Sequence, residues 1–251
     1  MRLLARTVAV AATLTVAACS SQGSDAPDTS ATAAGLLSGA ARGSSSPMGS
    51  ANLPAGSGRD IDVATLGYNR GDPDSPVRVL EMSDYGCGYC RQFHVETFPT
   101  LLAEFIETGM VEWKFMPFIT GMFDNSLAAT EAAECALLQS PAIFDRLNER
   151  LWTDQADWKR SREPEAVVRM MADDAGADLG ELDACLADDR QMDRIAGATS
   201  LAQQAGVRGT PTFFVFGYQP IQGALPTDAF REILTAVHAE ATKADTQEPG
   251  N

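Results

Sequence analysis

Hydrophobic and polar residues follow a strand's period in two short segments, and a helix's period lies between them. Val77–Met82 is an apolar run bounded by turn-forming residues, and Val111–Met116 alternates between apolar and polar positions. The helical pattern between them should be kinked by Pro99 and should end at Gly109. This order predicts a β-α-β unit with two parallel strands and a right-handed crossover.

The pattern changes after Asn125. From there to Ala205, hydrophobic residues recur at helical spacing along almost the whole chain. Proline and glycine divide this stretch into separate helices. The helices expected are Ser126–Gln139, Pro141–Trp152, Pro164–Ala175, Leu179–Ala187 and Arg190–Ala205. An apolar strand then begins directly after Thr210-Pro211, and a short strand is expected at Ile221–Gly223. The pattern of Pro226–Ala239 is that of a closing amphipathic helix.

The start of the chain has the composition of an export signal rather than of a folded element. Residues 1–18 combine a short cationic region with an apolar stretch that is too short to span a bilayer. Small residues directly precede Cys19, which resembles a bacterial lipoprotein signal, where that cysteine becomes the lipidated first mature residue. We therefore expect export and a lipid anchor at Cys19. The alternative is an ordinary secretory signal with a free thiol at Cys19.

Composition also divides the rest of the chain. Residues 19–58 are rich in Ser, Gly, Ala, Thr and Pro, which predicts a flexible tether with a root-mean-square reach of about 35 Å. The globular domain is expected over residues 59–240, with a helical insertion at about 122–205, and residues 241–251 are expected to form a disordered tail. The formal net charge of −15 argues against binding to nucleic acid and against adhesion to anionic lipid.

The motif Cys-Gly-Tyr-Cys at residues 87–90 carries the most specific chemistry in the chain. It follows a predicted strand and lies on the expected first turn of a helix. There, unpaired backbone N–H groups and the positive end of the helix dipole favour a thiolate at Cys87. Because thiolates attack disulfides, the motif indicates thiol–disulfide exchange, with Cys87 as the nucleophile and Cys90 as the resolving thiol.

Metal and haem sites explain the motif less well. Structural zinc needs four ligands, and the chain has only two histidines, His94 and His238, far apart in the sequence. A haem attachment site would need histidine where Arg91 stands. We predict neither a metal nor a cofactor, and we expect His94 to be a partly exposed helix residue rather than a catalytic base.

If Cys19 carries lipid, Cys135 and Cys185 are the two cysteines outside the motif. Four cysteines allow three pairings, and local closure of Cys87 with Cys90 leaves the other two as natural partners. On the chain-entropy relation, a bridge across about fifty residues stabilises the fold by roughly 3–4 kcal/mol. The alternative is that both are free, buried thiols that act as small hydrophobic residues.

The order of elements and two motifs resemble the DsbA-like branch of the thioredoxin superfamily. The first motif is Ser-Asp-Tyr-Gly-Cys-Gly-Tyr-Cys at residues 83–90, and the second is Gly-Val-Arg-Gly-Thr-Pro-Thr-Phe-Phe-Val at residues 206–215. The likeness covers about residues 64–238. It implies an α/β thioredoxin fold with a helical insertion between a β-α-β half and a β-β-α half that contains a cis proline.

The resemblance also assigns roles to individual residues. It implies that the Thr210–Pro211 bond is cis and lies against the cysteine pair, so that the backbone of Thr210 can bind an extended substrate peptide. Gly88 and Tyr89, between the two cysteines, would tune the thiolate and border the substrate. Glu81 would lie buried beneath the resolving cysteine and assist its proton transfers, with Lys114 on the neighbouring strand as a candidate ion-pair partner.

These observations together predict a lipid-anchored, extracytoplasmic thiol–disulfide oxidoreductase, which we expect to oxidise exported proteins and to be re-oxidised by a membrane partner. The direction of exchange depends on the reduction potential, which spans about −120 to −270 mV in such proteins. The alternatives are a reductase or isomerase with a narrow client, a non-catalytic peptide-binding or chaperone module, and a metal-delivery protein that uses Cys87, Cys90 and His94. Isomerases of this family have an N-terminal dimerisation domain, and here a low-complexity tether occupies that place.

Overall fold

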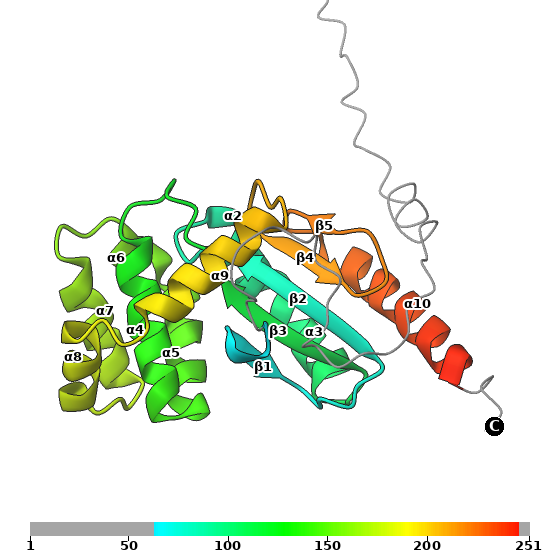
Figure 1. The fold of residues 1–251 in the computed structure, drawn as a ribbon, viewed down its shortest axis with the longest axis horizontal. Coiled ribbons are helices and arrows are strands. Elements are labelled where there is room, and N and C mark those ends of the chain that lie inside the picture. Colours follow the sequence, from blue (N-terminus) through cyan, green and yellow to red (C-terminus); the bar gives the residue numbers. More distant parts are fainter. Residues whose placement is uncertain (1–62, 246–251) are drawn as a thin grey trace, which may run out of the picture.

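A mixed five-stranded sheet forms the centre of this computed structural model, which describes residues 63–245 (Figure 1). The strands lie in the order β1-β3-β2-β4-β5, with β2 parallel to β3 and the other neighbours antiparallel. Their bounds are β1 Tyr68–Arg70, β2 Val77–Ser83, β3 Val111–Pro117, β4 Thr212–Val215 and β5 Ile221–Gln222. The export signal, Cys19 and the tether expected before residue 59 lie outside the described residues.

Helices account for most of the remaining described chain. Their bounds are α2 Gly88–Gln92, α3 Phe98–Leu101, α4 Ser126–Gln139, α5 Pro141–Thr153, α6 Gln155–Lys159, α7 Pro164–Asp174, α8 Leu179–Ala187, α9 Met192–Gln204 and α10 Thr227–Asp245. A 3-10 turn spans Val63–Thr65, and π-helical turns at Phe93–Thr97 and Leu102–Ile106 flank α3. Pro99 lies in the first turn of α3, where its missing N–H is tolerated, and the helix passes it through a wider π turn.

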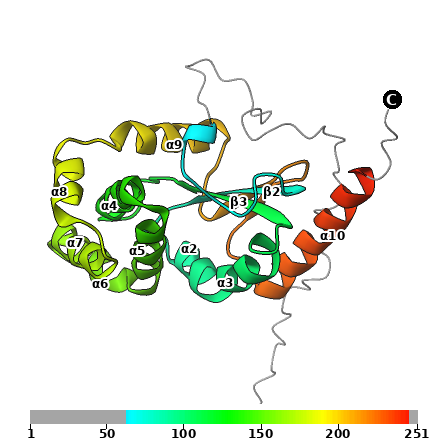
Figure 2. The same ribbon diagram turned by 90° about the horizontal axis from the view of Figure 1, so that it is seen from below.

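Helices cover both faces of the sheet. Figure 2 shows α9 on one face and α2, α3 and α10 on the other. One core contains Val79 and Trp113 of the sheet with Phe230 of α10, and the opposite core contains Met82 of β2 with Leu201 of α9. Because both faces are covered, every side chain of β3 is buried, as is usual for central parallel strands. The expected α/β thioredoxin fold with a helical insertion is therefore confirmed.

The insertion, α4 to α8, forms a helical lobe beside one end of the sheet (Figure 1). Its core includes Leu147, Leu151 and Trp158, and the same core extends to Cys87 and Cys90. The cysteine motif therefore lies where the helical lobe meets the sheet. None of the helices within residues 63–245 is both long enough and apolar enough to cross a bilayer.

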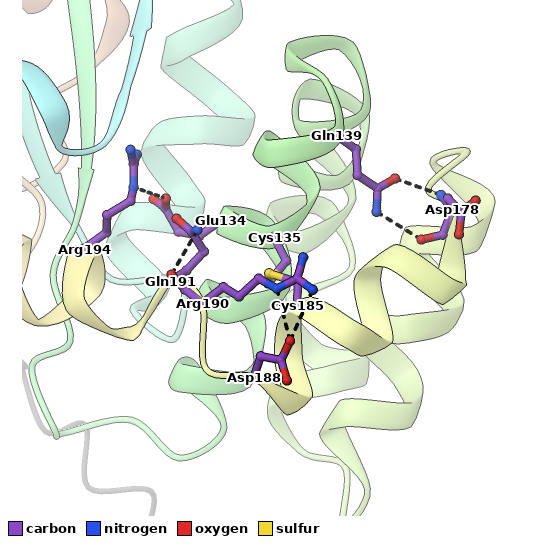
Figure 3. The surroundings of a disulfide bond; sticks show 9 residues. All are labelled: Glu134, Cys135, Gln139, Asp178, Cys185, Asp188, Arg190, Gln191 and Arg194. Atoms are coloured by element: carbon purple, nitrogen blue, oxygen red, sulfur yellow. Dashed lines mark hydrogen bonds and ion pairs between the residues drawn. A yellow bond between two sulfur atoms is a disulfide. The ribbon is translucent and has the colours of Figure 1, made fainter.

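A disulfide joins Cys135 of α4 to Cys185 of α8, with 5.9 Å between their Cα atoms (Figure 3). Two polar links flank it. The Gln139 side chain exchanges two hydrogen bonds with the backbone of Asp178, of 2.8 and 3.0 Å. On the other side, Arg194 of α9 pairs with Glu134 at 3.1 Å. The disulfide therefore stands at the centre of a connection from α4 to the later helices of the chain.

Three elements differ from the sequence prediction. Strand β1 and helix α6 were not predicted, because three and five residues are too few to show a period. The last helix continues to Asp245 instead of ending at Ala239, so the expected disordered tail is wrong for residues 241–245. Ala241 packs against the core of the sheet, and this contact extends the helix.

Candidate active site

The two thiols of the motif occupy different positions at the start of α2. Cys87 is the N-cap residue, with extended backbone angles, and Cys90 lies within the helix. Both thiols are free and buried, with Cys90 wholly without exposed surface. The N-cap position places the Cys87 sulfur beside N–H groups of the first helical turn that have no partner within the helix.

The electrostatics of the pair are strongly asymmetric. A hydrogen bond from Cys90 lowers the pKa of Cys87 to about 6, and the backbone N–H groups of Tyr89 and Cys90 add to this effect against the cost of burial. Burial raises the pKa of Cys90 well above its usual value, and the neighbouring Cys87 raises it further. At neutral pH, Cys87 is therefore mostly a thiolate and Cys90 a thiol, which is the asymmetry needed for one attacking and one resolving sulfur.

Alkylation should reveal this asymmetry directly. In the reduced protein, we expect iodoacetamide to modify Cys87 at a rate that rises with pH and reaches half its maximum near the Cys87 pKa of about 6, because only the thiolate reacts. Cys90 should stay unmodified up to pH 8. Mass spectrometry of quenched samples measures both rates. A midpoint above pH 8 for Cys87 would contradict the thiolate assignment.

The chain returns to this site at Thr210 and Pro211, which are joined by a cis peptide bond. The Cys87 thiol lies 3.3 Å from the Thr210 carbonyl oxygen, and β4 begins two residues later. The structure therefore brings together Cys87, Cys90 and the Thr210–Pro211 segment, as the motifs predicted. Tyr89 projects from the same end with 69% of its surface exposed.

A buried polar cluster lies beneath Cys90. Glu81 of β2 has no exposed surface, and its carboxylate accepts hydrogen bonds from the Trp113 indole at 2.9 Å and from the Ser83 hydroxyl. His94 Nε2 lies 2.7 Å from the same carboxylate. The Ser83 hydroxyl also opposes the rise in the pKa of Cys90, so this cluster is coupled to the resolving cysteine.

Two expectations about this cluster are wrong. Lys114 is not the partner of Glu81: the β2–β3 register aligns Lys114 with Leu80, and alternate residues of a strand face opposite sides. Its ammonium group instead donates to the Leu66 carbonyl at 2.7 Å. His94 is buried rather than partly exposed, because it follows Cys90 by four residues and so shares the helix face that packs on the sheet. That spacing was the signal available in the sequence.

The loop before Cys87 is held from both sides by residues that the sequence analysis did not assign. The Asp84 carboxylate accepts hydrogen bonds from the Gly86 N–H at 2.9 Å and from the Thr120 hydroxyl at 2.7 Å. From α6, the Gln155 amide donates to the carbonyls of Tyr85 and Cys87 at 2.6 and 2.9 Å. Asp84 belongs to the first motif, whereas nothing in the sequence pointed to Gln155.

The Lys159 ammonium of α6 completes this support by donating to the Gly86 carbonyl. Its charge also lies 4.9 Å from the centre of the Phe123 ring. Phe123 packs so closely on the loop that a Cβ at Gly86 would come within 2.4 Å of it, so only glycine fits there. Within residues 63–245, no three His, Cys, Asp or Glu side chains gather as metal ligands would.

Comparison with known proteins agrees with this geometry. The family model described as thioredoxin matches residues 66–236, so the chain belongs to the thioredoxin family. Among curated relatives, disulfide bond formation protein D of Bacillus subtilis is 27% identical over 146 residues, covering 58% of this chain and 65% of that protein. The Na(+)/H(+) antiporter NhaA 3 of Salinispora tropica is 33% identical over 148 residues, but the match spans only 21% of the antiporter and 59% of this chain.

Solved structures show the same fold. BdbD of Bacillus subtilis in its oxidised form superposes with a TM-score of 0.62 at 23% identity, over 68% of this chain and 92% of BdbD. The alpha-DsbA1 of Wolbachia pipientis gives a TM-score of 0.63 at 20% identity, over 72% of this chain and 97% of that protein. The DsbA-like resemblance is therefore confirmed for the fold, helical insertion included.

Proposed function

We propose that this chain is an extracytoplasmic thiol–disulfide oxidoreductase that oxidises the thiols of other exported proteins. The observation that carries the proposal is the opposite shift of the two thiol pKa values, which favours a thiolate at Cys87 and a protonated Cys90. The names of the relatives, disulfide bond formation protein and putative protein-disulfide oxidoreductase, support the same chemistry.

The reaction follows from the position of the two sulfurs. A substrate thiolate attacks Cys87 in the Cys87–Cys90 disulfide, and Cys90 leaves with the electron pair and takes up a proton. A second substrate thiolate then attacks the substrate sulfur of the mixed disulfide, so that Cys87 leaves as a thiolate and the substrate keeps the disulfide. Because the lowered Cys87 pKa stabilises the reduced enzyme, it makes the enzyme disulfide a stronger oxidant, which supports the oxidising direction.

The substrate would lie along the Thr210–Pro211 segment, beside the Cys87 sulfur. An extended peptide can hydrogen-bond the backbone of Thr210 as an added strand, while the Pro211 carbonyl is held by the Gly223 N–H. The exposed ring of Tyr89 and the exposed side chain of Met122 offer apolar contacts that suit an unfolded chain. Lipid attachment at Cys19, a location outside the cytoplasm and a membrane partner that re-oxidises Cys87 and Cys90 complete the proposal.

The reduction potential of the Cys87–Cys90 pair tests this function. The purified protein is equilibrated in glutathione buffers, and its thiols are then tagged and counted by mass. We expect a potential well above −270 mV, toward the value of about −120 mV of strong oxidants, because the pKa of Cys87 is lowered. A potential near −270 mV would identify a reductase instead, and the absence of a reversible couple would exclude exchange and leave the peptide-binding or metal-delivery alternatives.

A further inference from the structure

His94 packs against aromatic rings and contacts one acid. The Trp152 ring of α5 stacks on the imidazole, with 4.3 Å between the ring centres and an angle of 5° between the planes. The ring centres of Phe98 and Phe115 lie 5.2 and 5.8 Å from the centre of the imidazole. Since these rings are uncharged, the Glu81 carboxylate is the titratable group that faces the imidazole within hydrogen-bond distance.

The charged residues beyond these aromatic rings form an ion pair with each other. The Arg70 guanidinium of β1 lies 5.8 Å from the centre of the Phe98 ring, on the way to His94. It pairs with Asp145 of α5 at 2.7 Å. On the side of α2, Cys90 is the titratable group, and it meets the cluster through Ser83. Glu81 is therefore the ionisable residue that contacts the His94 imidazole directly.

Hydrogen bonds join Ser83 to Glu81 and Glu81 to His94, and the Ser83 hydroxyl lies close enough to Cys90 to lower the pKa of that thiol. Cys90, Ser83 and Glu81 have no exposed surface, whereas His94 keeps 8% of its surface. A proton that leaves or reaches Cys90 has to pass other buried groups, and His94 is the outermost of these residues. Its imidazole has two ring nitrogens, so it can accept a proton at one of them and release a proton from the other.

We propose that His94 is a positioning residue that takes up and returns the proton of Cys90 through Ser83 and Glu81. The proposal rests on the exchange reaction proposed above and adds a proton route to it. When Cys90 resolves a mixed disulfide, its sulfur bonds to Cys87, and the substrate sulfur leaves with the electron pair. The Cys90 proton passes to Ser83, the Ser83 proton passes to Glu81, and His94 takes one proton from Glu81; oxidation of a substrate reverses each step.

A glutamine at position 94 tests the route, because His94→Gln keeps a hydrogen-bonding amide beside Glu81 but cannot take up a proton. The measurement is the decay of a mixed disulfide between Cys87 and glutathione, followed from pH 5 to 9. At pH 7 we expect His94→Gln to slow resolution by Cys90 at least about tenfold, at the lower end of the range for proton-transfer catalysis. The pH dependence of the rate should also change shape.

A double-mutant cycle separates a shared route from general damage. Glu81→Gln should slow resolution at least as much, and adding His94→Gln to it should cause no further loss. His238→Gln, at the other histidine of the chain, should leave the rate unchanged. Near-UV circular dichroism checks that each variant is folded.

Two outcomes would overturn the proposal: a wild-type rate for His94→Gln at every pH, or losses from His94→Gln and Glu81→Gln that multiply. If glutamine at position 94 disturbs the fold, Ser83→Ala interrupts the same route between Cys90 and Glu81, and a wild-type rate in that variant would also overturn it. If the unmodified protein itself fails to resolve the mixed disulfide, the exchange function fails, and this result is distinct from a failure of His94 alone.

Discussion

Replacing Cys87 with serine will abolish thiol–disulfide exchange, with a rate at least about a thousandfold below that of the wild type. The hydroxyl of serine stays protonated where Cys87 is a thiolate, and it cannot form a disulfide. Cys90 cannot substitute for it, because that thiol is fully buried and its pKa is raised. Oxidation of a dithiol peptide, followed by mass, measures the loss.

Cys90→Ser is the matched variant, since it removes the second sulfur and leaves the first. We expect its Cys87 thiolate to attack a disulfide in the substrate, so that one substrate sulfur leaves as a thiolate and the mixed disulfide forms. The adduct should then accumulate, because no internal thiol is present to release the substrate. Non-reducing gels would show the trapped adduct for Cys90→Ser and none for Cys87→Ser. If Cys87→Ser kept full function in cells, the protein would be a peptide-binding or chaperone module rather than an oxidoreductase.

Replacing both Cys135 and Cys185 with alanine will lower the free energy of unfolding by about 3–4 kcal/mol. The bridge closes a loop with a sequence separation of 50 residues, and the chain-entropy relation gives a stabilisation of that size for about fifty residues. The flanking links from Gln139 to Asp178 and from Arg194 to Glu134 stay in place. The native lobe should therefore still form in the absence of denaturant.

Urea unfolding at constant pH measures this loss. Alanine variants are needed because a reducing agent would change the catalytic pair as well. Both proteins are therefore compared with Cys87 and Cys90 replaced by serine, so that the bridge is the only difference in covalent structure. A difference below about 0.5 kcal/mol would show that the bridge does not restrain the unfolded chain as the relation requires.

Patterns that repeat along the chain predicted the fold well. The helices that begin at Pro141 and Pro164 start where a proline without an N–H is tolerated, and both starts agree with the structure. Ser140 adds a further local signal, because its hydroxyl accepts a hydrogen bond from the Ile143 N–H at the start of α5. Such features depend on residues within one turn, and the sequence shows them directly.

The parts that were missed depend on contacts between distant residues. Gln155 reaches the loop before Cys87 from 68 residues away, and no local pattern encodes that distance. The burial of His94 depends on Trp152, which stacks on it from α5. The prediction that Lys114 pairs with Glu81 is wrong because residues on neighbouring strands meet only when both face the same side of the sheet. The register places Lys114 opposite Leu80.

Three consecutive carbonyl oxygens, from Tyr85 to Cys87, accept hydrogen bonds from the short helix α6. If α6 separates from this loop, the carbonyls of Tyr85 and Gly86 lose these donors, whereas the Cys87 carbonyl keeps the hydrogen bond from the Arg91 N–H. Buried carbonyls without donors are unfavourable. The catalytic loop and the helical lobe then belong to one cooperative unit of local unfolding. On heating, we therefore expect activity to be lost once the lobe opens, even where the sheet that carries the rest of the fold is still intact.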